Sequence, residues 1–185
     1  MATPDFVLSL RAAVGTAPLW LSGVTAVVTK GDDVLMVCRS DTGAWTPVTG
    51  IVDPGEHPAD AAAREVLEEA DVTAEPVRLA GVGVTGVVTY PNGDQASYLD
   101  HTFALRWVSG EPAPADGENT EARWFPRDAL PSISDEMRSR IDAGLSDEPG
   151  ARFTVAGELR SGSGASDDSS SADAAAGPAG PARAS

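Results

Sequence analysis

The feature that most limits how this chain can fold is the segment at residues 58–70, PADAAAREVLEEA. Pro58 suits the first turn of a helix, and no later residue in the segment breaks one. Successive residues on a helix are about 100° apart, so Glu65, Glu68 and Glu69 gather on one side and apolar residues on the other. We therefore expect a helix that packs its apolar side on a sheet, with three carboxylates on the opposite face.

Segments rich in β-forming residues lie on both sides of this helix. Strands are predicted at residues 19–29, 34–39, 45–52, 77–90, 95–108 and 120–125, and further helices at 5–14 and 135–144. The turn sequences at residues 31–33 and 91–94 predict hairpins. Several strands around one early helix, with another helix at the end, indicate an α/β (α+β) fold: an α/β/α sandwich with a mixed sheet.

Composition divides the chain into three parts. Residues 1–17 are predicted to form an N-terminal helical arm, and residues 18–146 a single domain. Residues 147–185 form an acidic tail rich in Gly, Ala and Ser, with a short strand or arm at 152–155. Such a composition buries too little apolar surface to offset the entropy lost on ordering, so we expect most of this tail to be disordered.

The chain is strongly acidic, with 28 Asp and Glu against 13 Lys and Arg and a net charge of −15. This field repels polyanions, so nucleic acid polymers and anionic membranes are not expected partners. A small phosphorylated ligand remains compatible if bound metal reverses the local charge. No leader or bilayer-spanning stretch is recognised, and the single cysteine, Cys38, is expected as a small core residue, so a cytoplasmic location is predicted.

Three glutamates within one helical turn repel one another, and a counter-charge must offset this. Arg64 supplies one locally, and a hard divalent cation such as Mg²⁺ would supply another through oxygen ligands. A solvated helix face is the alternative interpretation. Upstream, residues 48–51 are extended and lead through an Asp-Pro-Gly turn to Glu56, which can accept from backbone N–H groups or pair with Arg64.

The segment 50–72 resembles the signature of the Nudix hydrolase family. The matching positions are Gly50, Glu56, Arg64, Glu65, Val66, Glu68, Glu69 and Val72. Asp71 stands where the family has its closing glycine, which we expect to cost a little stability because glycine suits a left-handed helix cap. Val48-Thr49 replaces a common Pro-Gly pair. The resemblance covers roughly residues 24–141 and implies the sandwich fold given above.

Carried over to this sequence, the resemblance implies a set of ligands for Mg²⁺ or Mn²⁺: Glu65, Glu68, Glu69, the carbonyl of Thr49, and Glu118. Arg64 would orient a ligand carboxylate, and Glu56 would brace the loop. Either Glu65 or Glu118 would be the general base, and Glu121 competes with Glu118 for the distal acidic role. The catalytic residues expected are thus Glu65, Glu118 and Arg64.

Substrate contacts are expected from Trp45, Tyr90 and His101, although packing is an alternative role for each. Tyr98 and Trp124 are further candidates for stacking on a base. His57 is expected at the start of the helix, and the two separated histidines do not indicate a zinc site.

The resemblance implies a hydrolase that cleaves the phosphoanhydride of a nucleoside diphosphate linked to another moiety, such as a nucleoside triphosphate or an ADP-ribose-like compound. Two alternatives remain at this point. One is a ligand-sensing module on the same fold, and the other is a prenyl diphosphate isomerase with Cys38 as its reactive thiol. A homodimer built through residues 5–14 and 19–29 is compatible with the sequence.

Overall fold

The long strand β1 (Leu19–Lys30) is the central element of the computed structural model, which describes residues 3–162. Its residues from Gly23 to Val28 are buried without interruption, as expected of a strand covered on both faces. One edge of β1 pairs in parallel with β7 (Gln95–Ser109), and its other edge pairs with β4 (Val48–Ile51) and, further along, with β2 (Asp33–Arg39). The sheet is therefore mixed, as predicted.

The remaining strands extend this sheet in both directions. They are β3 (Trp45–Thr46), β5 (Thr73–Val84), β6 (Val88–Thr89), β8 (Asn119–Pro126), β9 (Arg152–Val155) and β10 (Glu158–Ser161). The sheet runs in the order β10-β9-β5-β7-β1-β2-β3, while β4, β6 and β8 pair with β1, β7 and β2 respectively. Since β2 joins β1 only at Thr29 and Lys30, the two strands diverge below that point, where β4 takes the place of β2.

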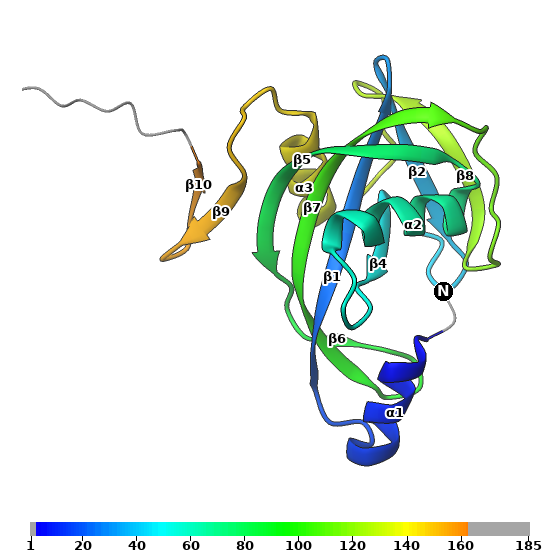
Figure 1. Ribbon diagram of the computed structural model, residues 1–185, viewed down its shortest axis with the longest axis vertical. Helices are drawn as coiled ribbons and strands as arrows, with labels where there is room; N and C mark the ends of the chain where they lie inside the picture. Colours follow the sequence, from blue (N-terminus) through cyan, green and yellow to red (C-terminus); the bar gives the residue numbers. More distant parts are fainter. Residues whose placement is uncertain (1–2, 163–185) are drawn as a thin grey trace, which may run out of the picture.

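Two helices cover opposite faces of the sheet (Figure 1). The helix α2 (Pro58–Ala70) packs on a cluster that includes Val24, Leu35 and Leu105. The helix α3 (Asp135–Leu145) packs through Ile141 on the other face, where Gly144 lies so close to Val27 that an added Cβ would be 2.4 Å from its Cβ. These layers confirm the predicted α/β/α sandwich.

The helix α1 (Asp5–Val14) lies apart from this sandwich, at the lower end of β1 and β7 in Figure 1. Its bounds match the predicted N-terminal helix, and its one buried residue, Val7, packs with Leu21 and Ala96. None of the helices in residues 3–162 has the length and continuous hydrophobicity that a bilayer crossing requires.

The predicted tail, residues 147–185, begins with ordered structure. Besides the predicted strand at residues 152–155, the chain adds β10 and forms a hairpin that projects from the sheet in Figure 1. This hairpin joins the sheet where Arg152 pairs with Gly81 of β5, a long-range contact that the low-complexity composition does not reveal. The rest of the predicted tail, residues 163–185, lies outside the described residues.

Candidate active site

The carboxylates of α2 lie in a different orientation from the one that helical periodicity predicts. Glu65 and Glu69 are only 1% and 3% exposed and are buried together with Ala61, Ala62, Val66 and Ala70. Leu67, expected on the apolar face, is 50% exposed. The expectation that all three carboxylates share the solvent-facing side is therefore wrong. The helix is rotated so that Glu65 and Glu69 face inward, and of the three only Glu68 is exposed.

Glu65 occupies the space left by the missing side chain of Gly50. A Cβ added to Gly50 would lie 2.1 Å from Cδ of Glu65, so any other residue at position 50 would displace the carboxylate. Oε2 of Glu65 is buried and has no hydrogen-bond partner. Burial raises the pKa of Glu65 to about 8, because the charged form loses its hydration, although the adjacent Arg64 acts in the opposite direction. A buried acceptor without a partner is typical of a site that awaits a cation or a proton.

Arg64 connects the loop to the helix through five contacts. Its Nε and one terminal nitrogen donate to the two carboxylate oxygens of Glu56, each at 2.9 Å. The other terminal nitrogen donates to Oε1 of Glu65 at 2.9 Å and to Oε2 of Glu68 at 3.1 Å. The carbonyl of Ile51 accepts a further bond at 3.2 Å. The fork on Glu56 lowers the pKa of that carboxyl, so the loop stays anchored to a charged pair.

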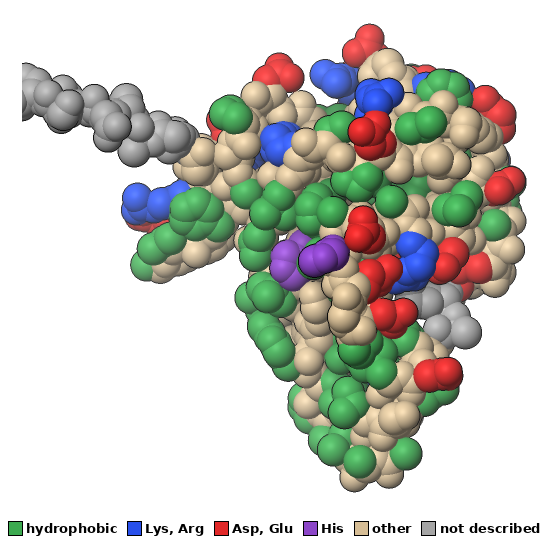
Figure 2. Space-filling model, in the orientation of Figure 1, with side chains coloured by type: hydrophobic (Ala, Val, Ile, Leu, Met, Phe, Trp, Pro, Cys, Tyr) green, Lys and Arg blue, Asp and Glu red, His purple; other side chains and the backbone are tan. Residues whose placement is uncertain are grey.

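Glu56 has both of the roles considered for it, because its Oε2 also accepts from the backbone N–H of Asp53 at 3.1 Å. Acidic side chains gathered around a basic one are visible over α2 and its preceding loop (Figure 2). This ion-pair network neutralises much of the repulsion among the glutamates. Glu65 and Glu69 are the two carboxylates of this helix that are buried, so their charged forms are the least hydrated.

Glu69 has a partner that the sequence did not indicate. Asn119, 5% exposed at the start of β8, donates from Nδ2 to Oε2 of Glu69 at 2.9 Å. Burial raises the pKa of Glu69 to about 7, and the Asn119 bond partly opposes that rise. Asn119 directly follows Glu118, which the sequence did single out, so proximity to that acid was the one available signal.

A cavity of about 1000 Å³ opens next to Gly50, the residue against which the Glu65 carboxylate packs. Its wall includes Thr49, Gly50 and Glu118 together with parts of α1, β6, β7 and α3. Tyr90 and Tyr98 also line it. The structure thus brings Thr49, Glu118 and Tyr90, all singled out in the sequence, to one cavity next to the signature helix.

Four other candidates lie elsewhere. Trp45 packs edge-on against Phe125, with ring centroids 4.9 Å apart. Nδ1 of His101 is 3.1 Å from the Gly23 carbonyl oxygen, and Glu121 forms an ion pair with Arg123. Trp124 packs against the α2 face of the core, beneath the Lys30 ammonium. None of these four is among the described residues that line the large cavity.

Arg39 is a basic residue of the cavity wall that no sequence motif indicated. Its Nε and one terminal nitrogen donate to the carboxylate of Asp41 at 3.0 and 2.9 Å. The Asp41 bond raises the pKa of Arg39, and the charges of Glu69 and Tyr90 contribute. A cation next to acidic residues in a cavity is suited to contact an anionic group.

The oxygen donors around α2 have the chemistry that a divalent cation requires. Among residues 3–162, no three His, Cys, Asp or Glu side chains form a ready-made ligand cluster. Arg64 donates to the Glu65 and Glu68 carboxylates in this structure. The donors are nevertheless carboxylate oxygens, which Mg²⁺ and Mn²⁺ prefer, and Oε2 of Glu65 is open. The residues present therefore fit a hard cation.

The end of α2 has the left-handed cap that the signature position of Asp71 indicates. This residue adopts φ 54° and ψ 32°, the left-handed conformation of a helix cap, and its N–H donates to the Leu67 carbonyl at 3.1 Å. At the start of the helix, His57 precedes Pro58 but makes no capping bond through its side chain. Both ends thus form where the local sequence places them.

Comparison with known proteins identifies related sequences and folds. A family model described as the NUDIX domain matches residues 20–144. The NAD-capped RNA hydrolase NudC of Pseudomonas syringae is 32% identical over 134 residues, which cover 68% of this chain and 44% of that protein. The 8-oxo-dGDP phosphatase NUDT18 of Mus musculus is 36% identical over 107 residues, covering 55% and 30% respectively. The chain thus spans less than half the length of these two relatives.

A solved structure, the MutT NUDIX hydrolase from Burkholderia pseudomallei, has the same fold. It is 23% identical, with a TM-score of 0.53, and the match covers 68% of this chain and 98% of that one. At this identity the likeness concerns the fold alone.

Proposed function

The chain belongs to the NUDIX family, and from this premise we propose that it is a metal-dependent hydrolase that cleaves the phosphoanhydride bond of a nucleoside diphosphate linked to another moiety. The observation that carries the proposal is the buried Glu65, held by Arg64 against Gly50 with one oxygen left without a partner. A carboxylate kept in this state costs stability unless a cation or a proton completes it.

We propose that Glu65, Glu68, Glu69, the Thr49 carbonyl and Glu118 hold the metal, Mg²⁺ or Mn²⁺. When bound, such an ion neutralises the diphosphate and lowers the pKa of an attacking water. Carboxylate donors favour these hard ions over softer ones. The strongly acidic chain, with its net charge of −15, would repel a diphosphate without this neutralisation.

The residues of the chain itself orient groups and take up the proton. Arg64, anchored on Glu56, restricts the rotamers of Glu65 and Glu68, and Asn119 does the same for Glu69. Two carboxylates, Glu65 and Glu118, are candidates for the base that takes a proton from the attacking water. Arg39, in the cavity wall near Glu69, is placed to contact a phosphate oxygen of the substrate.

The isomerase alternative lacks a suitable thiol in the cavity. Cys38 is 9% exposed, its Sγ lies 3.6 Å from the Gly43 carbonyl oxygen, and it is not among the described residues that line the large cavity. The sensing alternative shares the fold. It differs from our proposal only in the absence of turnover, which an assay decides.

We propose a small nucleotide conjugate as the substrate. The names of the relatives include NAD-capped RNA and 8-oxo-dGDP, both of which contain the required diphosphate. We retain a small molecule over an RNA polymer because of the acidic charge of the chain. A cytoplasmic location completes the proposal, because a free buried thiol such as Cys38 suits a reducing compartment. A homodimer is compatible with this proposal, which does not require one.

The test is a substrate panel assayed with Mg²⁺ or Mn²⁺ and repeated with a chelator. The panel contains deoxynucleoside triphosphates, 8-oxo-dGDP, NAD, ADP-ribose, a UDP-sugar and NAD-capped RNA, and the products are identified by mass. Glu69→Gln should lose most of the activity, while Glu75→Gln, on an exposed ion pair with Arg106, is the matched control. Absence of metal-dependent cleavage on every substrate, or full activity of Glu69→Gln, would overturn the proposal.

A further inference from the structure

The strand β10 forms one end of the sheet. Among the strands of residues 3–162 its neighbour is β9 alone, and all four of its residues, Glu158–Ser161, are exposed. Figure 1 shows β10 as the outermost strand of a hairpin that projects from the domain. The N–H and C=O groups along its outer edge therefore face no other strand of the described chain. Such an edge is a template for pairing with a further strand.

The β9–β10 hairpin, residues 152–161, leaves much of its apolar surface exposed. It joins the rest of the sheet at one residue pair, Arg152 with Gly81 of β5. Phe153, Val155 and Leu159 are 40%, 46% and 60% exposed, and hydrophobic side chains are visible on the hairpin in Figure 2. An isolated two-stranded hairpin is at best marginally stable in water. A further strand paired with β10 would therefore stabilise the hairpin.

The charge of the hairpin differs from that of the whole chain. The chain has a net charge of −15, so two copies repel each other over most of their surface. Between residues 152 and 161 the charged side chains are Arg152, Arg160 and a single acid, Glu158. This segment therefore lacks the excess of negative charge that keeps acidic proteins apart.

Glu158 and Arg160 lie two positions apart on β10, so their side chains are on the same face of the strand. Oε2 of Glu158 is 3.2 Å from a terminal nitrogen of Arg160, and the two side chains are 76% and 57% exposed. An ion pair as exposed as this one contributes little to the stability of its own chain. Both charges can therefore also interact with a strand added to this edge.

The order Glu-Leu-Arg makes β10 complementary to itself. When two copies of a strand pair antiparallel about a two-fold axis, the residue at the axis lies opposite itself. A pair centred on Glu158 opposes two acids, and one centred on Arg160 opposes two bases. A pair centred on Leu159 places the two leucines together and each Glu158 opposite Arg160 of the other copy. Opposite charges in opposed positions stabilise a strand pair and like charges destabilise it, so the sequence favours the register centred on Leu159.

We infer that the outer edge of β10 is an interface for a second copy of this chain, paired antiparallel in the register centred on Leu159. The inference goes beyond the proposed function and does not depend on it, since no residue from 152 to 161 is among the described residues that line the large cavity. It also concerns a different surface from residues 5–14 and 19–29. Because the paired strands are short, the dimer should be weak and depend on concentration.

The experiment measures self-association of the full chain by sedimentation equilibrium, in a concentration series up to roughly 1 mM, the weak end of specific association. By two-fold symmetry, Glu158→Arg and Arg160→Glu each place like charges opposite one another twice. Each should therefore raise the dissociation constant on the order of tenfold. Glu75→Arg and Arg106→Glu make the same changes at an exposed, directly opposed pair of β5 and β7 and are the matched controls.

An equimolar mixture of Glu158→Arg and Arg160→Glu separates strand pairing from general charge effects. In the mixed dimer the two arginines of one copy face the two glutamates of the other, so association should return to the parent level while each variant alone stays weaker. Both variants remain strongly acidic overall, so their net charges do not attract one another. Recovery in the mixture therefore requires residues 158 and 160 to oppose each other.

A cysteine at the axis gives a second readout, which does not require any change of charge. Leu159→Cys places a thiol opposite its own copy, close to the separation that a disulfide spans, so mild oxidation should link two copies. Val155→Cys, exposed on β9 but away from the outer edge, is the control, and the native Cys38 is buried. A thermal melt checks that every variant is folded.

The outcomes decide the inference in either direction. Concentration-dependent dimers that both charge reversals weaken and the mixture restores would support it, as would linkage of Leu159→Cys well above that of Val155→Cys. A parent chain that stays monomeric throughout the series would overturn it. A dimer unaffected by either reversal, or a mixture that associates no better than its components, would place the interface on another surface and overturn it as well.

Discussion

Asn119 and Glu69, 50 positions apart in the chain, are joined by a buried hydrogen bond of 2.9 Å from Nδ2 to Oε2. This bond links the start of β8 to the signature helix and fixes a carboxylate whose charge is otherwise poorly solvated. The remaining partners of the site come from the loop before the helix. Asn119 on β8 thus holds Glu69, while Arg64, anchored on Glu56 of the loop, holds Glu65.

Loss of this bond should impair catalysis more than folding. Asn119→Ala removes the donor that favours the charged form of Glu69, so the pKa of Glu69 should rise above about 7. We expect kcat/KM to fall by roughly 10–100-fold, the usual effect of removing a partner of a metal-binding side chain. The acidic limb of the pH profile should move to higher pH. Thr120→Val, the neighbouring position on β8, is the control, and an unchanged profile in Asn119→Ala would contradict the assignment.

Gly50→Ala tests the space occupied by Glu65. The new Cβ would lie 2.1 Å from Cδ of Glu65, so the carboxylate must leave its position. We expect a destabilisation of about 1–3 kcal/mol from overpacking and a loss of activity on the order of 100-fold from misplacement. Gly83→Ala, where nothing lies within 4 Å of the added Cβ, should leave both quantities unchanged. Urea unfolding and steady-state kinetics measure the two effects, and a fully active Gly50→Ala would refute this role of Gly50.

The stability of the metal-free protein should depend on pH through Glu65 and Glu69. Their pKa values in the folded state, about 8 and about 7, lie above the reference value of 4.5. Between pH 4.5 and 8 the folded protein thus binds more protons than the unfolded chain, and the free energy of unfolding falls as pH rises through that window. Glu65→Gln removes one of the two groups. Its stability relative to the parent should therefore increase from pH 5 to pH 8.

Urea titrations in a chelator at several pH values measure this difference. Glu75→Gln, an exposed position, corrects for the general charge of the acidic chain. If the difference in the free energy of unfolding between Glu65→Gln and the parent stays constant from pH 5 to pH 8, the pKa of Glu65 is not raised by folding, and the prediction is wrong. Added Mg²⁺ should reduce the pH dependence of the parent, because binding to the carboxylates displaces protons.

Asp71→Gly should stabilise the protein. Asp71 is in the left-handed conformation at φ 54°, which costs a non-glycine residue about 1 kcal/mol. Its carboxylate also lies at the negative end of the helix dipole. We expect a rise in Tm of about 2–4 °C for a chain of this size. Asp71→Asn removes only the charge and should give part of the gain, and a lower Tm for Asp71→Gly would contradict this account.

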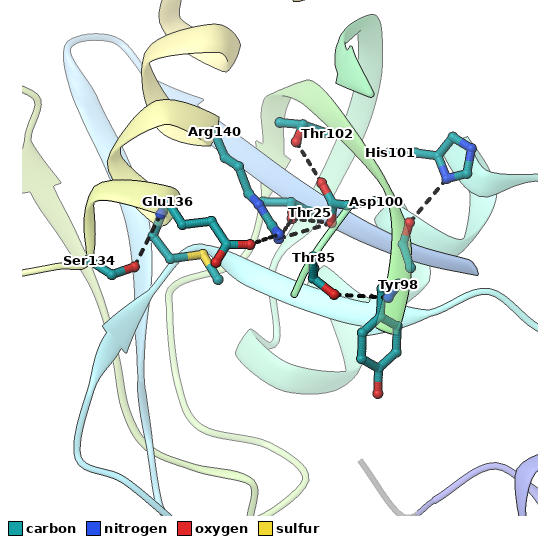
Figure 3. Close-up of polar contacts among 11 residues, drawn as sticks. Thr25, Thr85, Tyr98, Asp100, His101, Thr102, Ser134, Glu136 and Arg140 are labelled. Atoms are coloured by element: carbon teal, nitrogen blue, oxygen red, sulfur yellow. Dashed lines mark hydrogen bonds and ion pairs between the residues drawn. The ribbon is translucent and has the colours of Figure 1, made fainter. Parts of the chain in front are cut away.

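Arg140 should be needed for stability because it neutralises a buried acid. Asp100 is 5% exposed, and its Oδ1 accepts from Arg140 at 3.0 Å and from Thr25 at 2.7 Å, while Thr102 donates to Oδ2 (Figure 3). Arg140→Ala leaves this charge uncompensated and should cost about 3–5 kcal/mol. The double variant Arg140→Ala/Asp100→Asn should recover part of the loss. Urea unfolding of the parent, Arg140→Ala, Asp100→Asn and the double variant completes the cycle, and strictly additive effects would contradict the pairing.

The signature helix and the loop before it could be predicted from local sequence patterns. The bounds of α2, the left-handed Asp71 and the pairing of Arg64 with Glu56 and Glu65 match the expectations. These features depend on residues within one helix and the loop that precedes it, where spacing along the chain is close to spacing in three dimensions. The mixed sheet was likewise predicted from the alternation of strand and helix patterns.

Other aspects of the site depend on contacts between distant parts of the chain. Periodicity gives the angle between Glu65 and Leu67 around the helix axis, but the rotation of α2 against the sheet decides which is buried. Asn119 is an ordinary amide until β8 brings it to Glu69. Trp45 and Tyr90 were equivalent candidates, and only the packing placed one on Phe125 and the other in the cavity.

The sequence by itself determined that a helix rich in glutamate follows a Gly-containing loop, because helix formation and the fork of Arg64 on Glu56 are local. Only the tertiary structure decided that Glu65 and Glu69 are desolvated, and that a cavity lined by Gly50 and Glu118 lies next to them. The reason is physical: desolvation depends on everything that surrounds a group, and most of what surrounds these carboxylates comes from strands far away in the chain.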